Sequence, residues 1–236
     1  MEKLLRELVE RLQQAVGPNL QSVILYGSAA AGEYQPGFSD LNILCVVENL
    51  DLEALEQLSP VIAWWTKTGQ PAPLVFPREE LLRSADVFAI EMLDIRAAHR
   101  VLHGENLFAT LQVPMHLHRI EVERELRLQL LRLRQRYLAT PQNKKALLDL
   151  LAASISSTLT LFRHALLALG EPSAASRRAA LEQLSRLLGF DPAAFHALLD
   201  LREGKRRVAE LDPVALLRGY LGGLARVADE VDRRLG

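Results

Sequence analysis

The sequence predicts an α+β protein, in which a small domain built on a mixed β-sheet precedes a domain made only of helices. Two observations support this. In the first half of the chain, short runs of β-branched and aliphatic residues, typical of buried strands, alternate with helical patterns. From about residue 113 onward these runs disappear, and Leu, Ala and Arg dominate at helical spacing. We therefore expect residues 1–112 and 113–236 to form two domains.

The composition is that of a globular protein. The chain has 236 residues, 49% of them hydrophobic, and a formal net charge of −1 at pH 7, so we expect neither nucleic acid nor a membrane surface as a partner. The single cysteine, Cys45, lies in an expected buried strand and suits a reducing compartment. No signal-peptide core and no run of about 18 apolar residues is found. These features predict a cytoplasmic protein without a membrane span.

We expect the first domain to contain three strands and several helices. The strands are predicted at residues 22–26, 39–47 and 72–76. The helices are predicted at residues 2–16, 52–66 and 77 onward, and residues 86–102 are expected to form a further amphipathic stretch. Between the first two strands we expect a Gly-Ser turn that opens a short helix, and then a polar loop with Pro36 and Gly37.

Proline and glycine divide the second domain into five expected helices. Asp191 and Asp212 each precede a proline, which is the pattern of an N-cap residue followed by proline at the first helical position. The helices are predicted at residues 114–139, 142–169, 173–188, 192–207 and 213–235. We interpret them as a helical bundle.

The first domain is organised around Gly27-Ser28 and, after a spacer of eleven residues, Asp40-Leu41-Asn42. A glycine directly after a strand lets the backbone approach a ligand, and a helix that opens there directs N–H groups at an anion. Residues two apart on a strand share a face, so Asp40 and Asn42 are expected to project together. Phosphate donors opposite oxygen ligands suit a Mg²⁺-bound nucleoside triphosphate.

These segments resemble the signature of the nucleotidyltransferase superfamily, which includes DNA polymerase beta and the aminoglycoside nucleotidyltransferases. The resemblance covers roughly residues 20–105. It implies that Gly27 and Ser28 bind the nucleoside triphosphate. It also implies that Asp40 and Asn42 hold Mg²⁺ and act in catalysis, and that a helical bundle follows the sheet domain.

The sequence departs from the family pattern in its acidic residues. Asn42 replaces the second aspartate of the family, and the expected third strand at residues 72–76 carries no acid. Glu91 and Asp94, three residues apart in an expected helix, are candidates for a replacement carboxylate. The alternative is that both are solvated or pair with nearby arginines.

Three functions remain open. The first is transfer of a nucleoside monophosphate from a nucleoside triphosphate to a hydroxyl of a small-molecule or protein acceptor. The second is a catalytically degenerate nucleotidyltransferase that binds nucleotide as a sensor or partner protein. Asn42 favours this second function, because a single carboxylate neutralises little of the charge of two metal ions. The third is a scaffold whose bundle mediates oligomerisation, for example as a homodimer.

Two features of the second domain each have two interpretations. The helix at residues 114–139 carries six arginines among glutamates, either as a cationic wall facing the nucleotide or as a solvated face with i,i+4 ion pairs. The small and polar stretch at residues 152–160 either allows close helix packing or lines a pocket for a hydroxyl-rich acceptor.

Overall fold

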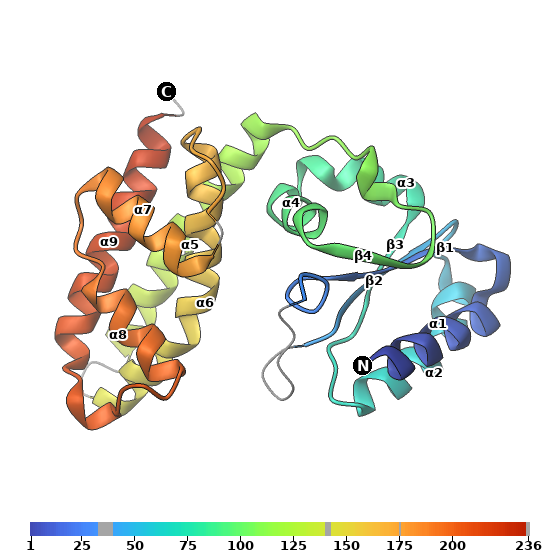
Figure 1. The fold of residues 1–236 in the computed structure, drawn as a ribbon, viewed down its shortest axis with the longest axis horizontal. Coiled ribbons are helices and arrows are strands. Elements are labelled where there is room, and N and C mark those ends of the chain that lie inside the picture. The colour runs from blue at the N-terminus through green and yellow to red at the C-terminus, as the bar shows by residue number, and fades with distance from the viewer. Residues whose placement is uncertain (33–39, 140–142, 175, 235–236) are drawn as a thin grey trace. The chain divides into compact units, whose positions relative to one another are not determined.

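The computed structural model describes residues 1–32, 40–139, 143–174 and 176–234 (Figure 1). The chain divides into two compact units, Met1–Pro114 and Met115–Gly236. The first unit is a mixed sheet with helices on both faces, and the described part of the second contains only helices. The predicted α+β fold class is therefore confirmed. The expected polar loop with Pro36 and Gly37 lies outside the described residues.

A four-stranded sheet forms the centre of the first unit, in the order β3-β2-β1-β4. Its strands are β1 (Leu20–Tyr26), β2 (Asn42–Val47), β3 (Leu74–Pro77) and β4 (His99–Gly104). β1 pairs antiparallel with β2 and with β4, whereas β2 and β3 are parallel. β1 therefore lies between two partners, and its register determines where the ends of both neighbours lie.

Helices cover both faces of this sheet (Figure 1). They are α1 (Glu2–Val16), α2 (Leu52–Lys67), α3 (Arg78–Arg83) and α4 (Ala89–Ala97). Side chains of successive strand residues point to opposite faces. Val23 and Leu25 of β1 accordingly pack with α1 and α2, while Ile24 packs with α3 and α4. Because both faces of the sheet are buried, β1 and β2 are continuous runs of apolar residues. Cys45 of β2 is buried with them.

The fourth strand corrects the sequence prediction. Residues 86–102 are expected to form one amphipathic stretch, but the structure divides it: α4 ends at Ala97 and the chain continues as β4. A short apolar segment is compatible with a helix or a strand, and here pairing with β1 decides the outcome. The Ser22 hydroxyl reinforces the pair, because it is fully buried and reaches the carbonyl oxygens of His103 at 3.2 Å and Glu105 at 2.8 Å.

Gly104 closes β4 in a backbone conformation that favours glycine, with φ of +76°. A Cβ atom there would lie 1.9 Å from the carbonyl oxygen of Gln21 in β1. No side chain fits at that distance, so β4 can pair with β1 in this register only with glycine at this position.

We predict that Gly104→Ala lowers the free energy of unfolding by about 3 kcal/mol, because the strain of a positive φ adds to a backbone clash. Gly69→Ala is the matched control, since Gly69 has φ of +85° but open space around its Cα. Positive φ alone costs about 1 to 2 kcal/mol. Urea denaturation of both variants measures the difference. Equal losses would contradict a clash at Gly104.

The second unit is a bundle of five α-helices within the described residues (Figure 1). They are α5 (Met115–Ala139), α6 (Lys144–Ala168), α7 (Arg177–Leu188), α8 (Ala193–Arg202) and α9 (Pro213–Arg233). α6 packs against all four others. Asp212 caps α9 as expected, accepting from the N–H of Val214. α8 ends at Arg202 and not at residue 207, and Gly204 with φ of +69° follows.

Short 3-10 helices complete the two units. They span Gly17–Asn19, Ser84–Asp86, Leu107–Ala109 and Val208–Glu210.

One helix, α6, is more apolar than the sequence analysis leads us to expect. By length and composition alone, α6 is long and apolar enough to cross a bilayer, and it is the one such helix in the described part of the chain. This is weak support for a membrane span, because core helices of bundles pass the same test. Leu151, Ile155 and Phe162 of α6 are indeed fully buried within the second unit.

Candidate functional site

The end of β1 and the start of β2 lie at the same end of the sheet. Tyr26, the last residue of β1, pairs with Asn42 of β2 on one side and with His99 of β4 on the other. Because β1 and β2 are antiparallel, the turn that follows Tyr26 lies beside the residues that open β2. The structure thus brings two of the predicted site residues, Gly27 and Asn42, together.

The Asn42 side chain occupies the space beside Gly27 that a larger residue would need. Its φ is +78°, and a Cβ atom on it would lie 3.2 Å from Asn42 Nδ2. Its N–H donates to the carbonyl oxygen of Ala98 at 2.9 Å, which anchors the turn to the residue before β4. Glycine at this position therefore satisfies two requirements, a left-handed backbone and room for the amide of Asn42.

The described segment after Gly27 is a turn. The N–H groups of Ala30 and Ala31 both donate to the carbonyl oxygen of Gly27 at 3.0 Å, and the described residues 28–32 contain no helix. The rest of the segment in which a helix is expected, residues 33–39, lies outside the described residues. Within the described part of the chain, however, the N–H groups of Ser28 and Ala29 have no backbone acceptor, and the half-buried Ser28 hydroxyl has no partner.

Asp40 lies just before β2 and is exposed to solvent. β2 begins at Asn42, so the expectation that Asp40 belongs to the strand is wrong. The backbone beside it is nevertheless held in place, because the N–H of buried Leu41 donates to the side-chain oxygen of Gln70 at 2.8 Å. No local pattern in the sequence singles out Gln70.

The two acids proposed as replacements lie on α4. Glu91 is exposed and lies near Tyr26, the last residue of β1. The pKa of the Tyr26 phenol is raised, mainly because the phenol is partly buried and secondly because of the negative charge of Glu91. Asp94 is half-buried one turn further along. Among the described residues, no group of three or more His, Cys, Asp or Glu side chains is placed to hold a metal ion. The structure thus brings Glu91 to the end of β1 but assembles no carboxylate cluster there.

These donors fit one magnesium ion but not two. Mg²⁺ is usually held by one or two carboxylates and the substrate's phosphates, and it keeps several waters. The Asp40 carboxylate satisfies that minimum. The amide nitrogen of Asn42 is on the side of Gly27, which leaves its oxygen as one further ligand. A pair of ions needs several carboxylates, and the described residues contain no group of three or more His, Cys, Asp or Glu side chains that could hold them.

Tyr26 and Ala98 position this site, and the sequence analysis identified neither. Tyr26 sets the register with Asn42, and Ala98 fixes Gly27 through its carbonyl oxygen. Both residues could have been found only from the pairing of β1 with β2 and β4. Such pairing links residues far apart in the sequence and leaves no local pattern.

We predict that Gly27→Ala lowers the free energy of unfolding by about 2 kcal/mol and shifts the NMR signals of the Asn42 side-chain amide. The cause is strain at positive φ together with crowding of Asn42 Nδ2. Gly32→Ala is the control, because Gly32 has φ of +80° with nothing near its Cα. An unchanged Asn42 signal in the Gly27 variant would show that the two residues are not in contact.

Comparison with known proteins agrees with this geometry. Residues 5–97 match the family model described as the nucleotidyltransferase domain. Among solved structures, a spectinomycin adenyltransferase from Enterococcus faecialis, crystallised with ATP and spectinomycin, superposes with a TM-score of 0.55. The match covers 100% of this chain and 99% of that one at 13% identity, so it establishes the fold alone. No curated protein sequence matches this chain. The predicted superfamily resemblance is confirmed.

Proposed function

Since this chain carries a nucleotidyltransferase domain at residues 5–97, we propose that its first unit binds the phosphates of a nucleoside triphosphate together with one Mg²⁺ ion. The observation that supports this most strongly is the turn after β1. It leaves the N–H groups of Ser28 and Ala29 without backbone acceptors in the described residues, directly after a glycine that keeps the backbone accessible. Successive free N–H groups form an anion-binding concavity even without a helix.

We assign Asn42 to the phosphates as well as to the metal. Its Nδ2 atom lies against Gly27, on the same turn as the two free N–H groups. An amide nitrogen donates to a phosphate oxygen, whereas an aspartate there would repel it unless a cation intervened. Where the family pattern has an aspartate that binds metal, this chain thus has an amide that donates to a phosphate. The single carboxylate of Asp40 then holds the one Mg²⁺.

Nucleotide binding without efficient transfer is the function that this geometry supports best. Two-metal transfer needs carboxylates that hold both ions, and the described residues offer no such cluster. A protein that retains the phosphate donors but lacks the second metal site suits a nucleotide sensor or a partner protein.

Nucleotidyl transfer to a hydroxyl of a small molecule or protein is the second candidate, and Glu91 favours it. This carboxylate lies close enough to Tyr26 to raise the pKa of the phenol, at the end of the sheet where Asn42 begins. A carboxylate near that edge is suited to accept a proton from an attacking hydroxyl. The solved adenyltransferase with ATP and spectinomycin pairs a nucleotide with a small hydroxylated molecule on the same fold.

Calorimetric titration of ATP, GTP, CTP and UTP, with Mg²⁺ and with EDTA, tests the proposal. We expect a dissociation constant on the order of micromolar for at least one nucleotide in Mg²⁺. Asp40→Asn should weaken the Mg²⁺-dependent affinity about tenfold, and Asp86→Asn, which removes another exposed carboxylate of the first unit, should not change it. Absence of nucleotide binding under every condition would overturn the proposal.

Asn42→Asp separates the role of phosphate donor from that of metal ligand. We predict that this variant binds nucleotide about tenfold more weakly in EDTA, because a carboxylate replaces a donor, and more tightly in Mg²⁺, because it adds a metal ligand. Titration in both buffers gives the two affinities. An equal change in both buffers would contradict a role for Asn42 at the phosphates.

Release of pyrophosphate in the presence of hydroxylated acceptors tests the second candidate. Transfer that depends on Glu91 should fall about a hundredfold or more in Glu91→Gln, while nucleotide affinity stays the same. Binding of nucleotide without any release of pyrophosphate would favour the sensor over the transferase.

A further inference from the structure

The segment that carries Asp40 lies ahead of the sheet. Asp40 and Leu41 precede β2, which begins at Asn42, and the pairing of β2 with β3 starts only at Leu44. Asn42 itself is held by its pairing with Tyr26 of β1. Neither Asp40 nor Leu41 belongs to a described strand ladder, so another contact must hold the backbone beside the Asp40 carboxylate.

The Gln70 side chain supplies this contact. Its Oε1 atom accepts a hydrogen bond at 2.8 Å from the N–H of Leu41, which lies 29 positions away in the sequence. Leu41 is buried, with 1% of its surface exposed, and Gln70 is half-buried. A hydrogen bond shielded from water is electrostatically stronger than one in solvent. Two anchors thus fix Leu41, its buried side chain and its bond to Gln70.

The loop between α2 and β3 holds Gln70 in place. On one side of Gln70, the N–H of Gly69 donates to the carbonyl oxygen of Thr66 at 3.0 Å. On the other side, the carbonyl oxygen of Pro71 accepts from the indole N–H of Trp65 at 2.9 Å. Gln70 therefore lies between two residues that are each bonded to α2.

This support reaches the core of the first unit through Trp65. The Trp65 side chain is fully buried and belongs to the same apolar cluster as Leu41. Pro71 also restricts Gln70, because a residue before proline favours an extended backbone. A continuous set of contacts thus runs from the core, through Pro71 and Gln70, to the backbone next to Asp40.

We propose that Gln70 is a positioning residue for the magnesium site and that it acts by fixing Asp40. The inference rests on the proposed function, because it requires Asp40 to hold Mg²⁺. Mg²⁺ demands near-ideal octahedral geometry, with oxygen ligands at about 2.0–2.1 Å. A carboxylate on an unsupported backbone would lose conformational entropy when it binds the ion. The bond from Leu41 to Gln70 removes part of that loss before the ion arrives.

The effect of Gln70 on nucleotide binding is expected only when metal is present. The turn at Gly27 is anchored separately, through the carbonyl oxygen of Ala98. Asn42 is held by its pairing with Tyr26. Loss of the Gln70 side chain should therefore leave phosphate binding intact and weaken only the part of the affinity that depends on Mg²⁺. A general loss of structure would weaken both parts.

Calorimetric titration of ATP, GTP, CTP and UTP into the full-length protein, in Mg²⁺ and in EDTA, tests this role. For the nucleotide that the wild type binds most tightly, we expect Gln70→Ala to weaken the affinity about fivefold in Mg²⁺ and to leave it within about twofold in EDTA. Gln57→Ala is the matched control, because Gln57 is an exposed glutamine of α2 that donates to Glu53 of the same helix. This control should change neither affinity.

Gln70→Glu separates the acceptor from the amide. It keeps an acceptor oxygen for Leu41 and adds a negative charge, so it should bind the nucleotide in Mg²⁺ at least as tightly as the wild type. Hydrogen exchange of the Leu41 amide, followed by NMR, should be about tenfold faster in Gln70→Ala than in the wild type or Gln70→Glu. This measurement reports on the hydrogen bond without any nucleotide.

A double-mutant cycle shows whether Gln70 acts through Asp40. In the Asp40→Asn background, Gln70→Ala should cause no further loss of Mg²⁺-dependent affinity, because the ligand that Gln70 positions is already missing. Independent effects would instead multiply.

Three results would overturn the role of Gln70 alone. They are a wild-type affinity of Gln70→Ala in Mg²⁺, equal losses of affinity in Mg²⁺ and in EDTA, and a further loss in the Asp40→Asn background. Rapid exchange of the Leu41 amide in the wild type would overturn the hydrogen bond on which this role depends. Absence of Mg²⁺-dependent nucleotide binding by the wild type would overturn the proposed metal site, and the role of Gln70 with it.

Discussion

The pairing of β1 with strands on both sides is the constraint on which the candidate site depends. It places Tyr26 between Asn42 and His99, and it brings the Gly27 turn against the first side chain of β2. A shift of one residue in either pair would turn every side chain of that strand to the opposite face of the sheet. Burial on both faces and the close approach at Gly104 prevent such a shift.

Charge limits what this site can do. The proposed phosphate donors are backbone N–H groups of the turn and the side-chain amide of Asn42 at the start of β2. Two metal ions need several carboxylates, and the described residues do not gather them. The proposed phosphate site and the metal chemistry reside in different atoms, so one can be present without the other.

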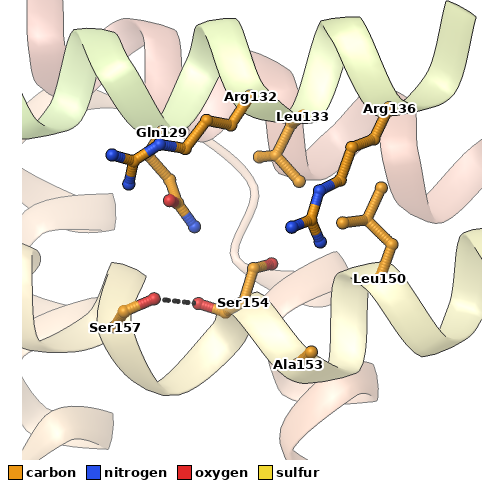
Figure 2. A pocket seen from close by; sticks show the side chains of 8 residues that line it. All are labelled: Gln129, Arg132, Leu133, Arg136, Leu150, Ala153, Ser154 and Ser157. Carbon is orange, nitrogen blue, oxygen red and sulfur yellow. Dashed lines mark hydrogen bonds between the residues drawn. The ribbon is translucent and has the colours of Figure 1, made fainter.

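A polar network satisfies buried hydroxyl groups in the core of the second unit. Tyr220 and Thr158 satisfy each other in the core of the bundle, where unpaired hydroxyls would destabilise the fold. The same network holds Ser154 and Gln129 beside a cleft between α5 and α6, which Figure 2 shows. Two arginines of α5 also line this cleft. The small and polar stretch at residues 152–160 thus serves close packing and also lines a pocket.

The sequence by itself determined the fold class, the five bundle helices and the turn at Gly27, because hydrophobic period, proline caps and the Gly-Ser signature are local properties. Only the tertiary structure decided that residues 99–104 form an edge strand, that Ala98 anchors the turn at Gly27 and that Asp40 precedes β2. It alone placed Glu91 near Tyr26 and Arg132 at a cleft. Pairing, burial and cavities depend on residues far apart in the chain, which no local pattern records.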